Sequence, residues 1–187
     1  MFCKAGEYIH YHPSINEAQF QMLIRKETAA DIEAITAVTV EAFKALEVSE
    51  QTEQFVIMAL RKAGALTISL VAEMGGEVVG HIAFSPVTLS DGTQNWYGLG
   101  PVSVLPTYQK QGIGAALINE GLSMLKELGA AGCALVGHPE YYKRFGFRNS
   151  TDLMFDGVPQ EAFFVMPFNE RIPQGKIFFH EAFLAKK

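Results

Sequence analysis

Two closely spaced glycines form the part of the sequence best suited to binding an anion. Gln109, Gly112 and Gly114 lie in the stretch PTYQKQGIGAAL, which leads into a run with helical spacing. The first backbone amides of a helix have no intrahelical partner, and the helix dipole adds partial positive charge there. Because glycines carry no side chains, these amides stay open to a bound group. The stretch therefore predicts a site of the size of a pyrophosphate.

A proline lies in the segment that leads into this stretch. Pro101 falls inside residues 96–105, WYGLGPVSVL, whose composition predicts a strand. Proline cannot donate a ladder hydrogen bond, so this strand is either at the edge of a sheet or bulged away from one neighbour. In both cases free backbone groups remain for a ligand with amides of its own. The two features together suit a long ligand with amides at one end and phosphates at the other.

Other phosphate motifs do not fit this stretch. A dinucleotide fingerprint needs a third glycine, where Leu117 stands, and a P-loop needs Gly-Lys followed by Ser or Thr, which the sequence lacks. The remaining alternative is that Gly112 and Gly114 only serve a tight turn.

The composition narrows the class of protein. The chain has 187 residues, of which 49% are apolar and 19% are charged, and its formal net charge is −5. We therefore expect a folded domain and no nucleic acid as the main partner. Cys3 and Cys133 have no metal-like spacing, and neither do the scattered histidines, which predicts no metal site and a reducing, cytoplasmic location. No apolar run is long enough for a bilayer, so no membrane partner is expected.

The order of patterns predicts one mixed α/β domain over residues 22–187, preceded by an N-terminal extension, residues 1–21, without clear periodicity. Asp31 is expected to cap the first helix, and Gly75-Gly76 to join two strands in a hairpin. The predicted strands are 22–27, two within 66–90, 96–105, 133–137, 162–168 and 175–183, and the predicted helices are 32–43, 49–62, 112–128 and 139–146.

Two stretches carry a family resemblance. VSVLPTYQKQGIGAALI resembles the acyl-CoA-binding motif of the GNAT N-acetyltransferase superfamily, in which Gln or Arg is followed by x-x-Gly-x-Gly or Ala. YYKRFGF resembles the later Tyr-x-x-x-Gly-Phe element, and VGHPEYYKRFGF followed by VPQEAFFVM is similar to a bacterial subgroup of predicted acetyltransferases. The resemblance covers about residues 22–184. It implies the GNAT acyl-CoA N-acyltransferase fold, a mixed central sheet with splayed middle strands flanked by helices.

The resemblance also implies how acetyl-CoA is held as a co-substrate. In the family the pantetheine arm pairs with the splayed strand, here Val102, Ser103 and Val104. The pyrophosphate lies on the loop and the helix start that follow. The residues implied for it are Gln109, Lys110, Gln111, Gly112, Ile113, Gly114 and Ala115.

The implied reaction moves an acetyl group from the thioester to a primary amine of a small molecule or a protein by direct attack. Tyr142 stands at the position that often acts as general acid, and the Val104 amide is expected to stabilise the oxyanion. Glu53, where the subgroup tends to place a glutamate, is the expected proton acceptor. His138 follows a strand end, near the expected meeting point of acceptor and thioester.

These residues also have structural explanations. Tyr142 can simply pack its ring, His138 can be a loop histidine bonded to backbone, and Tyr141 is expected to pack elsewhere than the site. The acidic residues of the first two helices can form a solvated face; they are Glu41, Glu47, Glu50 and Glu53.

Two other function classes stay open. One is a non-catalytic module that binds or senses acyl-CoA, and the other is a subunit or toxin-like partner acting on transfer RNA or ribosomal proteins. The acidic balance argues against RNA, though not against a protein acceptor. We expect a monomer or a homodimer.

Overall fold

The structure, a computed structural model of the chain, describes residues 21–44, 46, 49–169 and 171–186. In this part of the chain the main sheet has six strands in the order β1-β2-β3-β5-β6-β8, and of its neighbouring pairs only β5 and β6 run parallel. Its strands are Leu23–Lys26 (β1), Ile68–Met74 (β2), Glu77–Pro86 (β3), Trp96–Val104 (β5), Gly132–Val136 (β6) and Phe163–Pro167 (β8).

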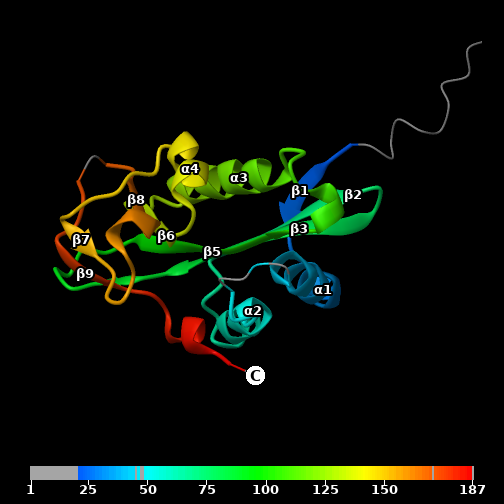
Figure 1. Cartoon of the computed structure of the whole chain (residues 1–187), viewed down its shortest axis with the longest axis horizontal. Coiled ribbons are helices and arrows are strands. Elements are labelled where there is room, and N and C mark those ends of the chain that lie inside the picture. Colours follow the sequence, from blue (N-terminus) through cyan, green and yellow to red (C-terminus); the bar gives the residue numbers. More distant parts are fainter. Residues whose placement is uncertain (1–20, 45, 47–48, 170, 187) are drawn as a thin grey trace, which may run out of the picture.

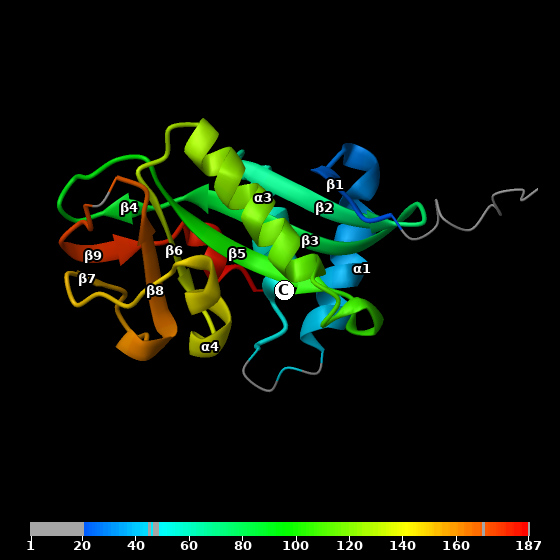
Figure 2. The ribbon, with the colours of Figure 1, turned by 90° about the horizontal axis from the view of Figure 1, so that it is seen from above.

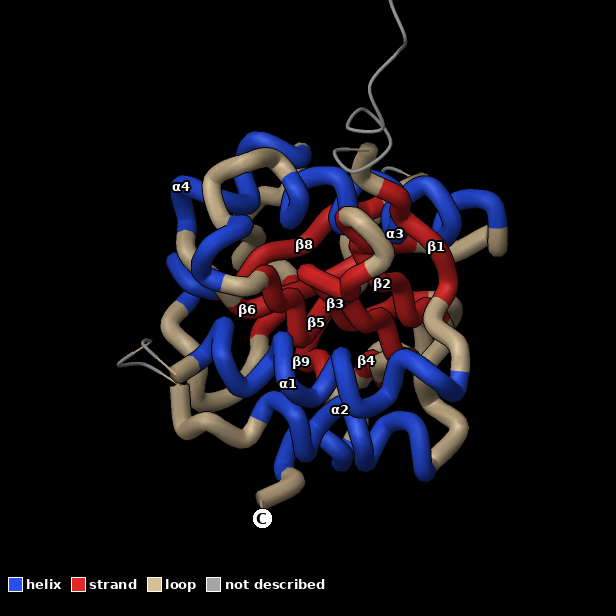
Figure 3. Tube along the Cα trace, turned by 90° about the vertical axis from the view of Figure 1, so that its right-hand side faces the viewer, coloured by secondary structure: helices blue, strands red, loops and turns tan. Residues whose placement is uncertain are grey.

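Helices cover both faces of this sheet. The helices are Ile32–Phe43 (α1), Glu53–Lys62 (α2), Ile113–Glu127 (α3) and Pro139–Tyr142 (α4). Figure 1 shows α1 and α2 on one face and α3 and α4 on the other. From above, α3 lies obliquely across the strands (Figure 2), and the end-on view shows the strands enclosed between the two helical layers (Figure 3). The predicted mixed α/β architecture, a central mixed sheet flanked by helices, is therefore confirmed.

A second, smaller sheet lies beyond β8. Its strands are Thr88–Leu89 (β4), Gly175–Phe178 (β9) and Leu153–Met154 (β7), in the order β4-β9-β7. The sequence predicted the order of the longer elements correctly but missed β4 and β7, because two-residue strands carry no readable alternation.

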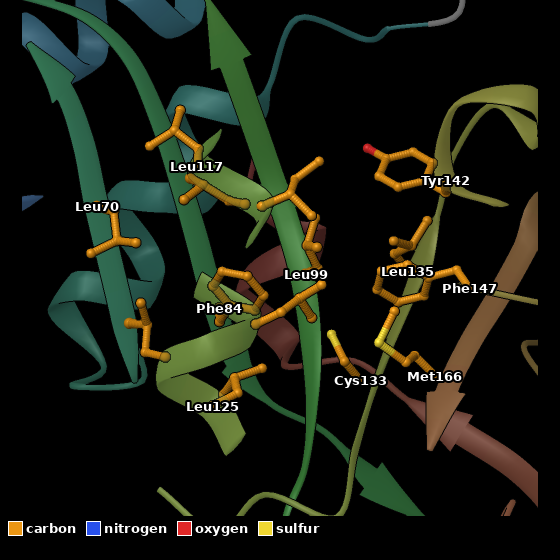
Figure 4. Packing of buried hydrophobic residues seen from close by; sticks show 14 of the residues in the cluster. Leu70, Phe84, Leu99, Leu117, Leu125, Cys133, Leu135, Tyr142, Phe147 and Met166 are labelled. Carbon is orange, nitrogen blue, oxygen red and sulfur yellow. The ribbon is translucent and has the colours of Figure 1, made fainter. Parts of the chain in front are cut away.

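The main core lies between the sheet and α3. Figure 4 shows Leu70, Phe84 and Leu99 of the strands beside Leu117 and Leu125 of α3. Helix and sheet approach closely where Gly121 faces Phe84, since a Cβ at residue 121 would lie 2.2 Å from the phenyl ring. This close approach holds α3, and with it the glycine stretch at its start, against β3 and β5.

Pro101 lies in a central strand, so the bulge is the correct one of the two alternatives. Ile82 of β3 pairs with Val102 and Phe84 pairs with Leu99, which leaves Ala83 opposite both Gly100 and Pro101. Two residues facing one is the pattern of a β-bulge, which bends a strand away from regular pairing.

The sheet splits on the other side of the same strand. β5 and β6 pair at only three positions, from Trp96↔Gly132 to Gly98↔Ala134. From Leu99 onward β5 has no partner strand on this side among the described residues. The predicted splayed middle strands are therefore confirmed, and they leave backbone groups of β5 open.

Two helix starts differ from those predicted from the sequence. Asp31 precedes α1 but does not cap it with its side chain, because its carboxylate accepts bonds from the amide and hydroxyl of Thr28 at 2.7 and 2.8 Å. Asp31 thus closes a capping box that begins at Thr28, and Arg25 also binds it at 2.8 Å. The second helix begins at Glu53 rather than near residue 49.

The expected extension, residues 1–21, lies outside the described residues except for residue 21. Among the described helices, none is both long and apolar enough to cross a membrane.

Candidate functional site

A cleft of about 670 Å³ opens where the split between β5 and β6 meets the start of α3. Strand β5, the loop before α3, the first turn of α3 and the α4 segment all contribute to its wall. The lining residues are Val102, Val104, Tyr108, Gln109, Lys110, Gly112, Gly114, Ala115, Tyr141 and Arg144.

The loop before α3 is held in shape by its own side chains. The Gln109 amide donates to the Val104 carbonyl at 3.0 Å, and the Gln111 amide donates to the Thr107 carbonyl at 3.0 Å. Lys110 and Gly112 both have positive φ, 61° and 88°. These turns bring the chain from β5 into α3 within a few residues.

The start of α3 is bare. Gly112 precedes the helix in the left-handed conformation and offers no side-chain cap, and its carbonyl accepts the amide of Ala116 at 2.9 Å. The amides before Ala116 lie ahead of the first such bond and have no helical carbonyl to bind. Because Gly112, Gly114 and Ala115 line the cleft, this positive end of the helix faces it.

Tyr141 closes the cleft opposite Gly114. A Cβ at residue 114 would lie 2.9 Å from the Tyr141 hydroxyl, so only glycine leaves the tyrosine its present place. Burial raises the pKa of Tyr141, although the charge of Arg144 acts in the opposite direction. Tyr141 thus has the expected packing role, since it packs against the main core, but it does so at the wall of the cleft and not elsewhere.

Three residues of the cleft were not predicted from the sequence: Tyr108, Tyr141 and Arg144. A signal for two of them existed, because residues three apart on a helical turn share one face. The spacing of Tyr141 and Arg144 thus predicted that the two side chains lie on one face of the turn. It did not predict that this face lines the cleft.

Seven of the ten predicted cofactor-binding residues line the cleft: Val102, Val104, Gln109, Lys110, Gly112, Gly114 and Ala115. The side chains of the other three lie elsewhere. Ser103 is buried with its hydroxyl 3.3 Å from that of Thr39 in α1, Ile113 is buried in the main core, and Gln111 binds Thr107. Strand alternation explains why the Ser103 side chain lies away from the cleft, because its neighbours Val102 and Val104 both line the cleft.

Tyr142 lies in the main core beside the cleft. Its side chain is only 8% exposed and contacts the rings of Tyr141, Phe147 and Phe164. Figure 4 shows its hydroxyl turned away from Phe147, in the direction of β5. Burial raises the pKa of Tyr142 above its ordinary value, which keeps the hydroxyl protonated at neutral pH.

Tyr142 is not among the lining residues of the cleft, and neither are the other two predicted catalytic residues. His138 is exposed and directly precedes α4. Glu53 is the first residue of α2, on the opposite face of the sheet from α3 (Figure 1). Its Oε1 accepts the Ser49 hydroxyl at 2.6 Å, whereas its Oε2 is buried without a hydrogen-bond partner among the described residues. The roles of Tyr142, Glu53 and His138 stay predictions.

The remaining acidic candidates differ from Glu53. Glu41 is paired with Lys44 at 3.4 Å and Glu50 with Lys186 at 3.0 Å, and both pairs are exposed. Glu47 lies outside the described residues. Glu41 and Glu50 thus fit the solvated face that the sequence left open as an alternative.

A buried polar network joins β1, β2, β3 and α2. Glu27, just after β1, accepts the Arg61 guanidinium at 2.8 and 3.0 Å and the Ser69 hydroxyl at 2.5 Å. The Ser69 oxygen lies 2.8 Å from Nε2 of the fully buried His81. Because the Ser69 hydroxyl already donates to Glu27, Nε2 of His81 carries the proton, and burial lowers the pKa of this histidine.

This network predicts a stability effect that depends on pH. Burial alone would raise the pKa of Glu27, but the donors His81, Arg61 and Ser69 outweigh it and lower the pKa from 4.5 to about 2. A lowered folded-state pKa gives stability that is complete above pH 4.5 and lost as the pH falls towards 2. We expect Glu27→Gln to lower the free energy of unfolding at pH 7 by about 3 kcal/mol.

Urea unfolding of the wild type and the variant at several pH values measures this difference, which should shrink between pH 4.5 and 2. Glu77→Gln, at the exposed start of β3, is the control and should change little. A difference that stays constant with pH would contradict the role given to the Glu27 charge.

Among the residues that the structure describes, no group of three or more His, Cys, Asp or Glu is arranged to hold a metal ion. Cys133 is buried, and burial raises the pKa of its thiol.

Comparisons with known proteins agree with this geometry. The family model "Acetyltransferase (GNAT) family" matches residues 32–147. The uncharacterized N-acetyltransferase YhbS of Escherichia coli is 38% identical over 127 residues, which are 67% of this chain and 73% of that protein.

Two solved structures are similar over most of the chain. A GNAT family acetyltransferase from Brucella melitensis, in complex with acetyl-CoA, has a TM-score of 0.79 and 47% identity over 87% of this chain and 98% of its own. E. coli YhbS in complex with CoA has a TM-score of 0.80 and 32% identity, covering 89% and 93%. With its split sheet, its bare helix start and these matches, the chain belongs to the GNAT acetyltransferase family.

Proposed function

We propose that the protein transfers the acetyl group of acetyl-CoA to a primary amine of a small molecule or a protein. The observation that carries the proposal is the single cleft that contains both the open edge of β5 and the bare start of α3. One surface offers hydrogen bonds to amides, and the other offers positive charge to phosphates. The complexes of the two similar proteins with acetyl-CoA and CoA support this donor.

The donor would lie along the cleft in one direction. Its pantetheine amides would bind free backbone groups of β5 around Val102 and Val104, apart from the Val104 amide, which would bind the oxyanion. Its diphosphate would lie on the loop and the first turn of α3, at Gly112 and Gly114. The acetyl group would then reach the split between β5 and β6, beside Tyr142.

In the reaction a bond forms between the amine nitrogen and the thioester carbon, and the carbon–sulfur bond breaks. The amine must be neutral to attack, yet with a pKa near 10.4 only about one lysine-like amine in 2,500 is neutral at pH 7. Glu53 is proposed to take the amine proton, directly or through water, with His138 as the second candidate. The Val104 amide would bind the oxyanion, and the Tyr142 hydroxyl would protonate the departing thiolate.

The central experiment separates an enzyme from a binding module. Calorimetry should detect acetyl-CoA binding, and thiol release should occur when the protein, acetyl-CoA and a suitable member of a panel of primary amines are combined. No binding at millimolar acetyl-CoA would contradict the proposal as a whole. Binding without turnover by any small or peptidyl amine would favour the non-catalytic acyl-CoA module.

The start of α3 provides a direct test of the donor site. Gly112 has φ +88°, a conformation that costs about 1–2 kcal/mol in a residue with a Cβ, although the space around it is open. We expect Gly112→Ala to weaken acetyl-CoA binding about 10-fold by displacing the first amides of the helix. Calorimetry measures the change in Kd.

Gly129 supplies the matched control. It lies beyond the other end of the same helix with φ +75° and equally open space. Gly129→Ala should lower the melting temperature about as much as Gly112→Ala but leave the Kd unchanged. Equal weakening of binding by both variants would show that the effect comes from general loss of stability.

A further inference from the structure

Two cationic side chains face the cleft from different parts of the fold. Lys110 lies in the loop before α3, and Arg144 lies in the helical turn Lys143–Phe145 that follows α4. Neither forms an ion pair with a carboxylate among the described residues, although the chain as a whole carries a net charge of −5. The cleft therefore combines unpaired positive charge with the positive end of α3.

Aromatic rings hold Arg144 in place, with no acidic partner among the residues that the structure describes. Its guanidinium lies 4.6 Å from the centre of the Tyr141 ring and 4.9 Å from that of Phe145. Stacking on aromatic faces orients the planar guanidinium and leaves its N–H donors free at the edges. Tyr141 in turn packs opposite Gly114, so the stacked Arg144 guanidinium is held at the wall of the cleft.

The neighbouring lysine shows the opposite behaviour. Lys143 is exposed, and its ammonium lies 3.5 Å from Glu140 one turn earlier. Two consecutive cations thus differ in their surroundings: Lys143 is neutralised locally and is absent from the cleft, whereas Arg144 lines it. The position of Arg144 is therefore not explained by the general charge of the helical turn.

A guanidinium of this kind fits a phosphate monoester. Arginine binds two oxygens of a phosphate through parallel N–H donors, which gives both affinity and orientation. The first turn of α3 offers backbone amides for a diphosphate, and a further dianionic group would still need a partner. Besides its diphosphate, CoA carries one such group, the 3′-phosphate of its ribose.

We propose that Arg144, assisted by Lys110, binds the 3′-phosphate of CoA and makes the protein discriminate against donors that lack this phosphate. This inference rests on the proposed acetyl-CoA site. It assigns a specificity-determining role to the stacked Tyr141–Arg144 pair, beside the bare helix start that takes the diphosphate.

The test compares CoA with dephospho-CoA by calorimetry on the whole chain. We expect the wild type to bind CoA more tightly by about 10- to 100-fold, the usual range for hydrogen bonds to a charged group. Arg144→Gln should lose most of this preference and bind the two ligands with similar affinity. Arg144→Lys should keep part of it, because the charge remains while the planar fork is lost.

Lys143→Gln is the matched control and should keep the full preference for CoA. An equal loss of affinity for both ligands in Arg144→Gln would overturn the inference, because it would place Arg144 at a group that both ligands share. A wild type that binds both equally would overturn it too while leaving the donor site intact. Failure to bind either ligand would instead contradict the proposed function.

Discussion

Replacing Tyr142 by phenylalanine should lower kcat by about 10²–10⁴-fold, the usual contribution of a general acid. The variant removes only the hydroxyl oxygen, and the contacts of the ring with Phe147 and Phe164 remain. Because burial raises the pKa of Tyr142, the hydroxyl keeps its proton at neutral pH and cannot serve as a base. Its loss should therefore affect the departure of the thiolate, while the KM for acetyl-CoA stays nearly constant.

Steady-state kinetics with a good amine acceptor measures this effect. Tyr97→Phe is the control, because Tyr97 is a partly buried tyrosine packed against the same core but has no proposed role in the reaction. It should leave kcat unchanged. If Tyr142→Phe also turns over like the wild type, the ring has only the packing role that the sequence left open.

Replacing Glu53 by glutamine should lower kcat/KM for the amine about 100-fold at pH 7. The reason is the scarcity of neutral amine: without a proton acceptor the reaction depends on the roughly one molecule in 2,500 that is already neutral. This fraction rises tenfold with each pH unit below the amine pKa. The deficit of the variant should therefore shrink as the pH approaches 10, and that pH dependence separates a chemical role from a structural one.

Glu50→Gln provides the comparison on the same surface. Glu50 lies three residues earlier, is exposed and pairs with Lys186 at 3.0 Å, whereas Glu53 has a buried oxygen without a hydrogen-bond partner in the described part of the chain. The Glu50 variant should behave like the wild type at every pH. Full activity of Glu53→Gln at pH 7 would remove Glu53 as proton acceptor, and a deficit independent of pH would show that it only shapes α2.

The parts of the fold that were predictable are those with local physical causes. The hairpin at Gly75-Gly76 and the start of α3 after Gly112 depend on residues that tolerate positive φ. The strand at Pro101 had to be either an edge strand or bulged, because proline donates no ladder hydrogen bond. Each of these features follows from the conformational limits of one or two residues, so it can be predicted from the sequence alone.

Other features depend on partners far away in the chain. The sequence predicted Asp31 as a helix cap. In the structure its carboxylate instead accepts hydrogen bonds from Arg25 of β1 and from the Thr28 amide. Ser103 and Ile113 belong to the motif by position, yet their side chains turn to α1 and to the core. Helical and strand periodicity tell which residues share a face, but not what that face contacts.

The sequence by itself determined that a bare helix start follows a strand that cannot donate a ladder hydrogen bond at Pro101, since glycine and proline impose these limits locally. The tertiary structure alone decided that the two features share one cleft and that Tyr141 and Arg144 form its far wall. Those residues come together because β5 and β6 diverge and the α4 segment brings Tyr141 and Arg144 to the cleft. A contact between segments about 30 residues apart is set by packing, which no local pattern encodes.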